Sequence, residues 1–343
     1  MQRSDDPPSS RRAGLGRLVR SRRLLWSSWL LGAALLAGVV AMAMHLSAAE
    51  EFTRLLAQVQ PGWFALALLL QALTYLAQGQ IYRLVSRAGR ALLSLWSACT
   101  LGLMKLFVDQ ALPTLGLSGA LAVTAAFERL GVPRPVVIAC LVIGVMSYLL
   151  AYVLALMLAL GIVIVAGHAS GLLVAACALF ALVSLGVALG TVWLAGRRSP
   201  RLPWGLAERG WIRRSLAILR SADSALARNP RLLAQATALD LGIFLLDATT
   251  LWLLVRALGE GASWSGVFAA YMLASVLRSI GVTPGGLGVF EGAAVATLHG
   301  AGVALPVALS ATLLFRGLSF WLPMLPGLLV VRSALRGQRA ARR

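Results

Sequence analysis

Apolar runs of about twenty residues or more recur along the whole sequence, and this feature restricts the fold more than any other. A run of this length crosses a hydrocarbon core of roughly 30 Å as a helix that rises about 1.5 Å per residue. The 59% hydrophobic and 13% charged residues exclude a soluble globular protein. We therefore expect an all-α integral membrane protein, since helices satisfy their own backbone groups in lipid.

Eight runs are candidate membrane spans: residues 24–49, 63–84, 91–112, 135–167, 170–195, 232–255, 265–282 and 307–331. Two further stretches, 113–130 and 284–301, are apolar but contain Gly and Pro and are too short for comfortable spans. Either they cross as short helices or each folds back with the run before it. On length we predict two re-entrant hairpins, at 91–130 and 265–301.

The formal net charge of +19 comes from Arg clusters that flank the apolar runs, which indicates membrane orientation rather than nucleic-acid binding. The positive-inside rule predicts that the clusters are cytoplasmic, and with two hairpins all of them fall on one side. If the two short stretches cross the membrane instead, ten spans result and the Arg clusters still fall on one side. Charge therefore does not distinguish crossing from hairpin. The resulting division is a basic N-terminus (1–23), a first membrane half (24–196), a basic linker (197–231), a second membrane half (232–331) and a basic tail (332–343). Both termini are then cytoplasmic.

The linker alternates Arg with apolar residues in a nearly helical pattern. We predict that it lies on the cytoplasmic leaflet as an amphipathic segment, with a solvated basic connector as the alternative.

An internal repeat is indicated when the sequence is displaced by 171 residues. Four residues then fall on identical residues without a gap: Pro113 on Pro284, Gly131 on Gly302, Val132 on Val303 and Pro135 on Pro306. Under the predicted topology the two halves are inverted in the membrane. Inverted repeats with broken helices near the midplane are typical of transporters.

The segment 284–291, Pro-Gly-Gly-Leu-Gly-Val-Phe-Glu, has the densest chemical signal. Its glycines can adopt positive φ and leave backbone amides uncovered, which suits a headgroup at a helix N-terminus. The candidate substrate-binding residues are Pro284, Gly285, Gly286, Gly288 and Glu291. The alternative is a tight turn in which Gly permits close packing and Glu291 stabilises the start of the helix.

Ionisable residues at membrane depth are costly and are usually functional or paired. Arg316 in the last span is expected either to pair with Glu291 or to bind a phosphate. Lys105 and Asp109 are four residues apart and are predicted to form a local ion pair. Asp109 and Arg278 complete the candidate substrate-binding residues.

Other charged residues fit less specific roles. Asp240 and Asp247 share a helix face that suits a cation or proton route, although Asp240 could simply lie near the cytoplasmic interface. Glu128 and Arg129 could line a cavity or lie at its mouth. We predict no metal or cofactor, since His and Cys residues are isolated, and we identify no catalytic motif.

The segment 284–291, followed by Gly302-Val303, Leu314-Phe315-Arg316 and Phe320-Trp321-Leu322-Pro323, resembles the lysylphosphatidylglycerol synthase transmembrane-region family, the flippase-like membrane domain. The resemblance maps the Pro-Gly-Gly-x-Gly-x-x-Glu pattern of the family to 284–291 and its last-span Arg to Arg316. In the first half, the resemblance implies that Asp109 takes the place of a polar family residue, whereas 114–119 lacks the Glu of relatives. Because the sequence ends at Arg343, we expect no aminoacyl-transferase domain.

The resemblance implies flipping or handling of an anionic lipid or lipid-linked precursor in a bacterial inner membrane. The alternatives are a membrane subunit or scaffold of a lipid-synthesis pathway, such as hopanoid or lipid-linked glycan synthesis, and an intramembrane lipid-modifying enzyme. The expected partners are membrane lipids and a lipid-synthesis enzyme, not nucleic acid.

Overall fold

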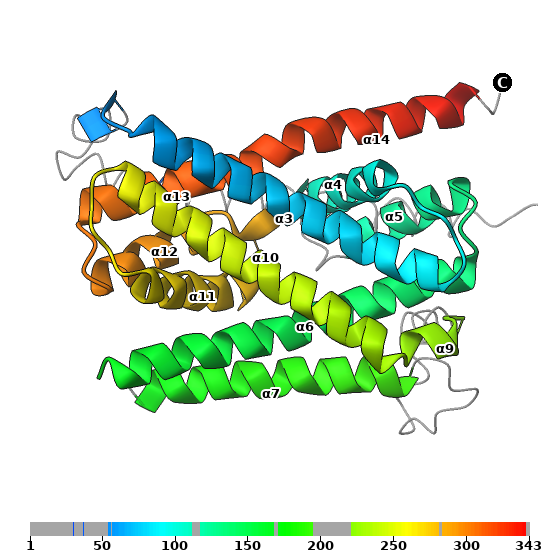
Figure 1. Cartoon of the computed structure of the whole chain (residues 1–343), viewed down its shortest axis with the longest axis horizontal. Coiled ribbons are helices and arrows are strands. Elements are labelled where there is room, and N and C mark those ends of the chain that lie inside the picture. The colour runs from blue at the N-terminus through cyan, green and yellow to red at the C-terminus, as the bar shows by residue number, and fades with distance from the viewer. Residues whose placement is uncertain are drawn as a thin grey trace, which may run out of the picture.

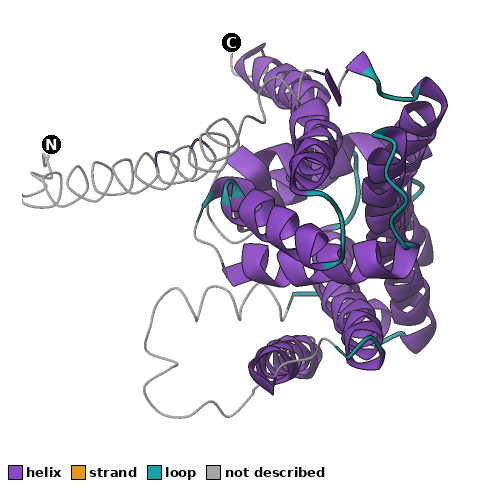
Figure 2. Cartoon of the chain, turned by 90° about the vertical axis from the view of Figure 1, so that its left-hand side faces the viewer, coloured by secondary structure: helices purple, strands orange, loops and turns teal. Residues whose placement is uncertain are grey.

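The computed structural model describes residues 57–111, 117–167, 171–194, 221–280 and 283–340, together with 30, 37, 54 and 55. These parts of the chain are helices joined by short loops, without a strand (Figure 2). Five of their helices are long and apolar enough to cross a membrane. The prediction of an all-α integral membrane protein is confirmed. Nearly all of the predicted first span, 24–49, and most of the linker, 197–231, lie outside the described residues.

Four of the five long helical segments are single helices: α3 (Pro61–Ala88), α6 (Arg134–Val165), α7 (Gly171–Leu194) and α10 (Pro230–Ala257). The fifth is continuous through α13 (Leu305–Arg316), a π-helical turn η2 (Gly317–Trp321) and α14 (Leu322–Ala340). Proline lies in the first turn of α3, α6, α10 and α13, where its missing N–H is not needed.

Two pairs of shorter helices lie between the long ones. The first pair is α4 (Leu95–Ala111) and α5 (Leu117–Arg129); the second is α11 (Trp264–Ile280) and α12 (Val289–Gly300), separated by the short turn η1 (Pro284–Gly286). A helix of 17 residues, such as α4 or α11, reaches only about 26 Å. The members of each pair pack against each other, which agrees with the two predicted Gly/Pro-broken hairpin segments.

The predicted inverted repeat is visible in the backbone. The corresponding helices α3 and α10 both have 28 residues, and they run side by side in Figure 1. They run antiparallel, because the N–H of Gln60, just before α3, donates to the carbonyl of Ala257 at the end of α10 over 2.9 Å. The turns at Gly131 (φ 76°) and Gly302 (φ 92°) also match. In each, the following valine N–H donates back five residues, Val132 to Phe127 and Val303 to Leu298.

The buried apolar residues form two main clusters. One is built mainly by α3, α4, α5 and α6, and the other by α6, α10, α11, α12 and α13. Leucines on the outer faces, such as Leu154 and Leu182, are exposed, as expected of helices that contact lipid. We call the two pairs of shorter helices, α4 with α5 and α11 with α12, the broken pairs. The candidate site lies where they approach α3 and α10.

Candidate functional site

The turn that precedes α12 requires glycine at three positions. Gly285, Gly286 and Gly288 have φ values of 58°, 69° and 78°, which are in the left-handed region. A Cβ atom on Gly285 would overlap the ring of Phe320, and one on Gly286 would overlap the aliphatic stem of Arg278. The glycines therefore bring the backbone close to Phe320 and Arg278.

We expect Gly286→Ala to lower the free energy of unfolding by at least about 1–2 kcal/mol, the cost of a left-handed residue with a side chain. Overlap with Arg278 adds to this cost. The measurement is thermal unfolding of the purified protein in detergent. Gly300→Ala is the matched control, since a Cβ atom there meets nothing within 4 Å; equal stability of the two variants would contradict the expectation.

A buried ion pair connects this turn to α13. Glu291 and Arg316 are 1% and 4% exposed, and Arg316 Nε donates to Glu291 Oε1 over 2.7 Å. The backbone N–H of Gly288 donates to the other carboxylate oxygen, also over 2.7 Å, so Glu291 caps the start of α12. Arg316 Nη2 donates to the carbonyl of Gly285 over 3.1 Å. The pair thus holds the turn against the last long helical segment.

The aromatic surroundings of Arg316 are part of the same arrangement. Its guanidinium carbon lies 4.3 Å from the centroid of the Phe320 ring and 5.4 Å from that of Phe290. Such stacking stabilises a desolvated arginine. Phe320 lies in η2, and π-helical turns of this kind are frequent at functional sites.

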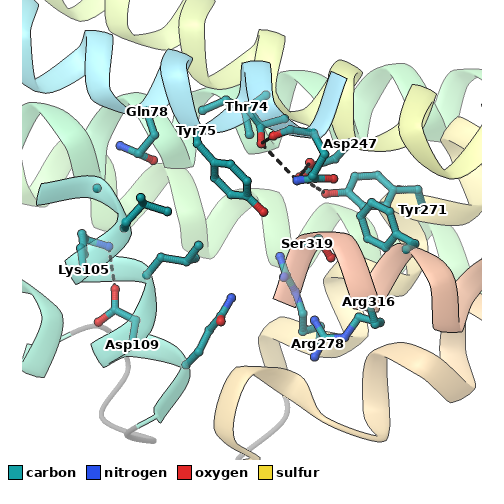
Figure 3. A pocket seen from close by; sticks show the side chains of 17 residues that line it. Thr74, Tyr75, Gln78, Lys105, Asp109, Asp247, Tyr271, Arg278, Arg316 and Ser319 are labelled. Atoms are coloured by element: carbon teal, nitrogen blue, oxygen red, sulfur yellow. Dashed lines mark hydrogen bonds and ion pairs between the residues drawn. The ribbon is translucent and has the colours of Figure 1, made fainter. Parts of the chain in front are cut away.

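A polar cavity of about 170 Å³ adjoins the Glu291–Arg316 ion pair on the side of Arg316. It lies between α3, α4, α10, α11 and the last helical segment (Figure 3). Its charged lining residues are Lys105, Asp109, Asp247, Arg278 and Arg316. Its uncharged polar lining residues are Gln71, Thr74, Tyr75, Gln78, Gln110, Tyr271 and Ser319. Apolar residues are exposed on the outer faces of the long helices, so the cavity is a polar compartment within a membrane domain.

The charged residues that line the cavity differ in their interaction partners. Lys105 Nζ lies 2.7 Å from Asp109 Oδ2, and Arg316 is held by Glu291 behind the cavity wall. Asp247 accepts from Gln71 Nε2 over 3.2 Å and from the hydroxyl of Tyr271 over 3.0 Å. Within the described residues, Arg278 forms no ion pair, and its guanidinium carbon lies 5.7 Å from the Phe290 ring centroid.

The cavity also contains hydrogen-bond acceptors without a partner. Gln71 Oε1 and Gln110 Oε1 are buried and accept no hydrogen bond from the described residues. Unpaired buried polar atoms of this kind are costly unless water or a ligand supplies the missing bond. With Arg278 as cation, the arrangement can bind a phosphate and the hydroxyl or amine donors of the group attached to it.

The candidate substrate-binding residues divide between the cavity wall and the layer behind it. Arg278, Arg316 and Asp109 line the cavity. The turn at 284–288 and Glu291 do not line it, but Gly285, Gly288 and Glu291 contact Arg316 or its carboxylate partner. Of the two alternatives for Arg316, the structure has the pair with Glu291.

Several charged residues lie elsewhere. Asp240 is buried and accepts from the hydroxyl of Ser147 over 2.6 Å, so only Asp247 of the aspartate pair reaches the cavity. Glu128 lies 3.7 Å from Arg134 at an exposed position. Neither Glu128 nor Arg129 lines this cavity.

Sequence reasoning did not identify the amide and hydroxyl groups of α3. Gln71, Thr74, Tyr75 and Gln78 recur at helical spacing on the face of α3 that lines the cavity. Polar residues at this spacing inside an apolar span are the signal that could have found them. Gln110 and Ser319 have no comparable signal, because only the tertiary structure brings them to α3.

The lysylphosphatidylglycerol synthase transmembrane-region model matches residues 29–327. The chain belongs to this family. The match extends over both broken helix pairs, the turn before α12 and Arg316. No curated protein matches this sequence. The lysylphosphatidylglycerol synthase transmembrane-region family associates the chain with lipid chemistry in a membrane, and the cavity lies entirely within the matched residues.

Proposed function

We propose that this protein translocates an anionic lipid, or a lipid-linked precursor, by receiving its headgroup in the polar cavity while the tails stay in apolar surroundings. The observation that carries the proposal is Arg278, a cation that lines a cavity among membrane helices and has no carboxylate within 4 Å among the described residues. A phosphate is the ligand that an arginine fork of this kind binds best.

The inverted repeat supports movement rather than static binding. Two broken helix pairs, one in each half, flank the cavity through α4 and α11. Repeats that run antiparallel can exchange roles, so that a central site opens to one side and then to the other. In this proposal Lys105 and Asp109 lie at the first broken pair, and Arg278 lies at the second.

The test is a headgroup-accessibility assay in proteoliposomes. Fluorescently labelled phosphatidylglycerol, a labelled polyprenyl phosphate and labelled phosphatidylcholine are each compared with protein-free liposomes, using a membrane-impermeant quencher. We expect protein-dependent movement of a phosphate-bearing anionic lipid and slower movement of phosphatidylcholine. If folded protein moves none of the anionic lipids, translocation is wrong, and a scaffold or a lipid-modifying subunit becomes the better hypothesis.

A further inference from the structure

An apolar groove adjoins the polar cavity. It has a volume of about 470 Å³ and lies between α3, α4 and α14. On α14 it is lined by Leu322, Pro323, Leu325, Pro326 and Leu329. Helix α14 packs more closely against α4 than against α3, and residues of all three helices line the groove.

The groove and the cavity share part of their walls. Gln71, Tyr75 and Leu103 line both. Gln71 is 2% exposed, and its Oε1 atom has no hydrogen-bond partner within the part of the chain that the structure describes. The polar compartment therefore continues into an apolar one within the reach of a single side chain, which is the arrangement that an amphiphile needs.

Tyr75 lies at the boundary between the two compartments. Its ring extends from α3 toward the centre of the cavity (Figure 3), and its hydroxyl donates to the carbonyl of Leu318 over 2.9 Å. Leu318 belongs to η2, the π-helical turn that begins directly after Arg316. This hydrogen bond joins α3 to the last helical segment on the side where the groove meets the cavity.

At Gly327, α14 approaches α4 closely. A Cβ atom on Gly327 would lie 2.6 Å from Cβ of Phe107 and 2.9 Å from the carbonyl oxygen of Leu103. Without a side chain at this point, α14 can rest on α4 while its other face remains open beside α3. The groove is thus a consequence of how α14 is seated.

We propose that this groove is the tail-binding site of the transported lipid, which enters sideways between α3 and α14 with its headgroup in the cavity. The proposal rests on the proposed function and adds the route and the binding surface of the hydrocarbon chain. The occupant is a lipid tail rather than a protein segment, because the groove is continuous with a headgroup-sized polar cavity. Tyr75 separates tail from headgroup.

Ala72→Trp tests the groove. Ala72 lines the groove from an exposed position on α3, so a tryptophan there fills the groove without removing buried packing. Ala65→Trp is the matched control: Ala65 is also exposed and lies two turns earlier on α3, outside the groove lining. For each variant and for Arg278→Gln, dissociation constants are measured for long-chain phosphatidylglycerol in mixed micelles and for sn-glycerol 3-phosphate, which lacks tails.

We expect Ala72→Trp to weaken phosphatidylglycerol binding at least tenfold and to leave sn-glycerol 3-phosphate binding unchanged, whereas Ala65→Trp changes neither. Arg278→Gln should weaken the binding of both ligands. Wild-type affinity of Ala72→Trp for the lipid, or an equal loss in Ala65→Trp, would overturn the tail site. Unchanged binding of both ligands by Arg278→Gln would instead overturn the headgroup assignment, and no binding of phosphatidylglycerol by the wild type would overturn both.

Discussion

Replacing Arg316 with glutamine is expected to lower the free energy of unfolding by about 3–5 kcal/mol, the largest loss of stability that we predict for a single change in this protein. The substitution leaves the Glu291 carboxylate at a 1% exposed position, where the Gly288 N–H is its remaining hydrogen-bond donor among the described residues. It also removes the link between Arg316 and the Gly285 carbonyl. Glu291→Gln should cost a similar amount, because the arginine then keeps a buried charge without a counter-ion.

A double-mutant cycle measures this pair in thermal and SDS-induced unfolding. The Glu291→Gln/Arg316→Gln protein should lose less stability than the sum of the two single variants, since neither buried charge remains alone. Lys105→Gln is the control, because the Lys105–Asp109 pair is partly exposed, with side chains 37% and 21% accessible, and should be worth less than about 1 kcal/mol. Strict additivity in the cycle would show that Glu291 and Arg316 are not energetically coupled.

Replacing Arg278 with glutamine is expected to slow anionic-lipid movement by about 10- to 100-fold while changing stability little, since hydrogen bonds to charged groups contribute about 1.5–3 kcal/mol. Arg278 is half-buried at the cavity wall and forms no ion pair among the described residues. When it is replaced, the Asp247 carboxylate in the same cavity keeps its hydrogen bonds from Gln71 and Tyr271. The measurement is the proteoliposome assay with labelled phosphatidylglycerol. Arg278→Lys should retain part of the rate, because the charge remains but the planar fork does not.

Arg256→Gln provides the matched control for Arg278. The Arg256 guanidinium stacks near Trp63 and Trp252, with its carbon 6.0 and 5.6 Å from the ring centroids, and it does not line the cavity. We expect this variant to transport at the wild-type rate. Equal rates for the Arg278 and Arg256 variants would mean that Arg278 does not bind the headgroup, even if transport itself is observed.

The two broken helix pairs resemble each other in a way that their sequences conceal. In the second half, Glu291 caps α12 by accepting from the Gly288 N–H and pairs with Arg316. In the first half, Asp109 accepts from the N–H of Gly119 in α5 over 3.1 Å and pairs with Lys105. Each carboxylate therefore binds both a cation and the start of the second helix, where the helix dipole favours negative charge.

This similarity bears on the absence of a Glu in 114–119. At the first pair the carboxylate comes from the preceding helix, α4, rather than from the helix that it caps. Sequence comparison by position cannot find such a replacement, because the Asp109 carboxylate reaches α5 only when α4 and α5 fold against each other. The two pairs thus have corresponding charges without corresponding sequence positions.

The sequence by itself determined the helical membrane fold, the two short broken pairs and the repeat. These follow from local properties: the length of apolar runs, the positions of Gly and Pro, and their recurrence at a fixed displacement. It also determined the Lys105–Asp109 pair, since residues four apart on a helix are neighbours whatever the tertiary structure.

Only the tertiary structure decided which polar groups share the cavity and which charges remain available. From the sequence, Arg316 was expected either to pair with Glu291 or to bind a phosphate. In the structure Arg316 contacts the turn before α12, and Glu291 neutralises it. Arg278 became the available cation because no carboxylate of the described residues comes within 4 Å of it, and Asp247 was separated from Asp240 by their different neighbours. The physical reason is that ion pairing and enclosure depend on contacts between helices distant in sequence, whereas helix formation depends on neighbours along the chain.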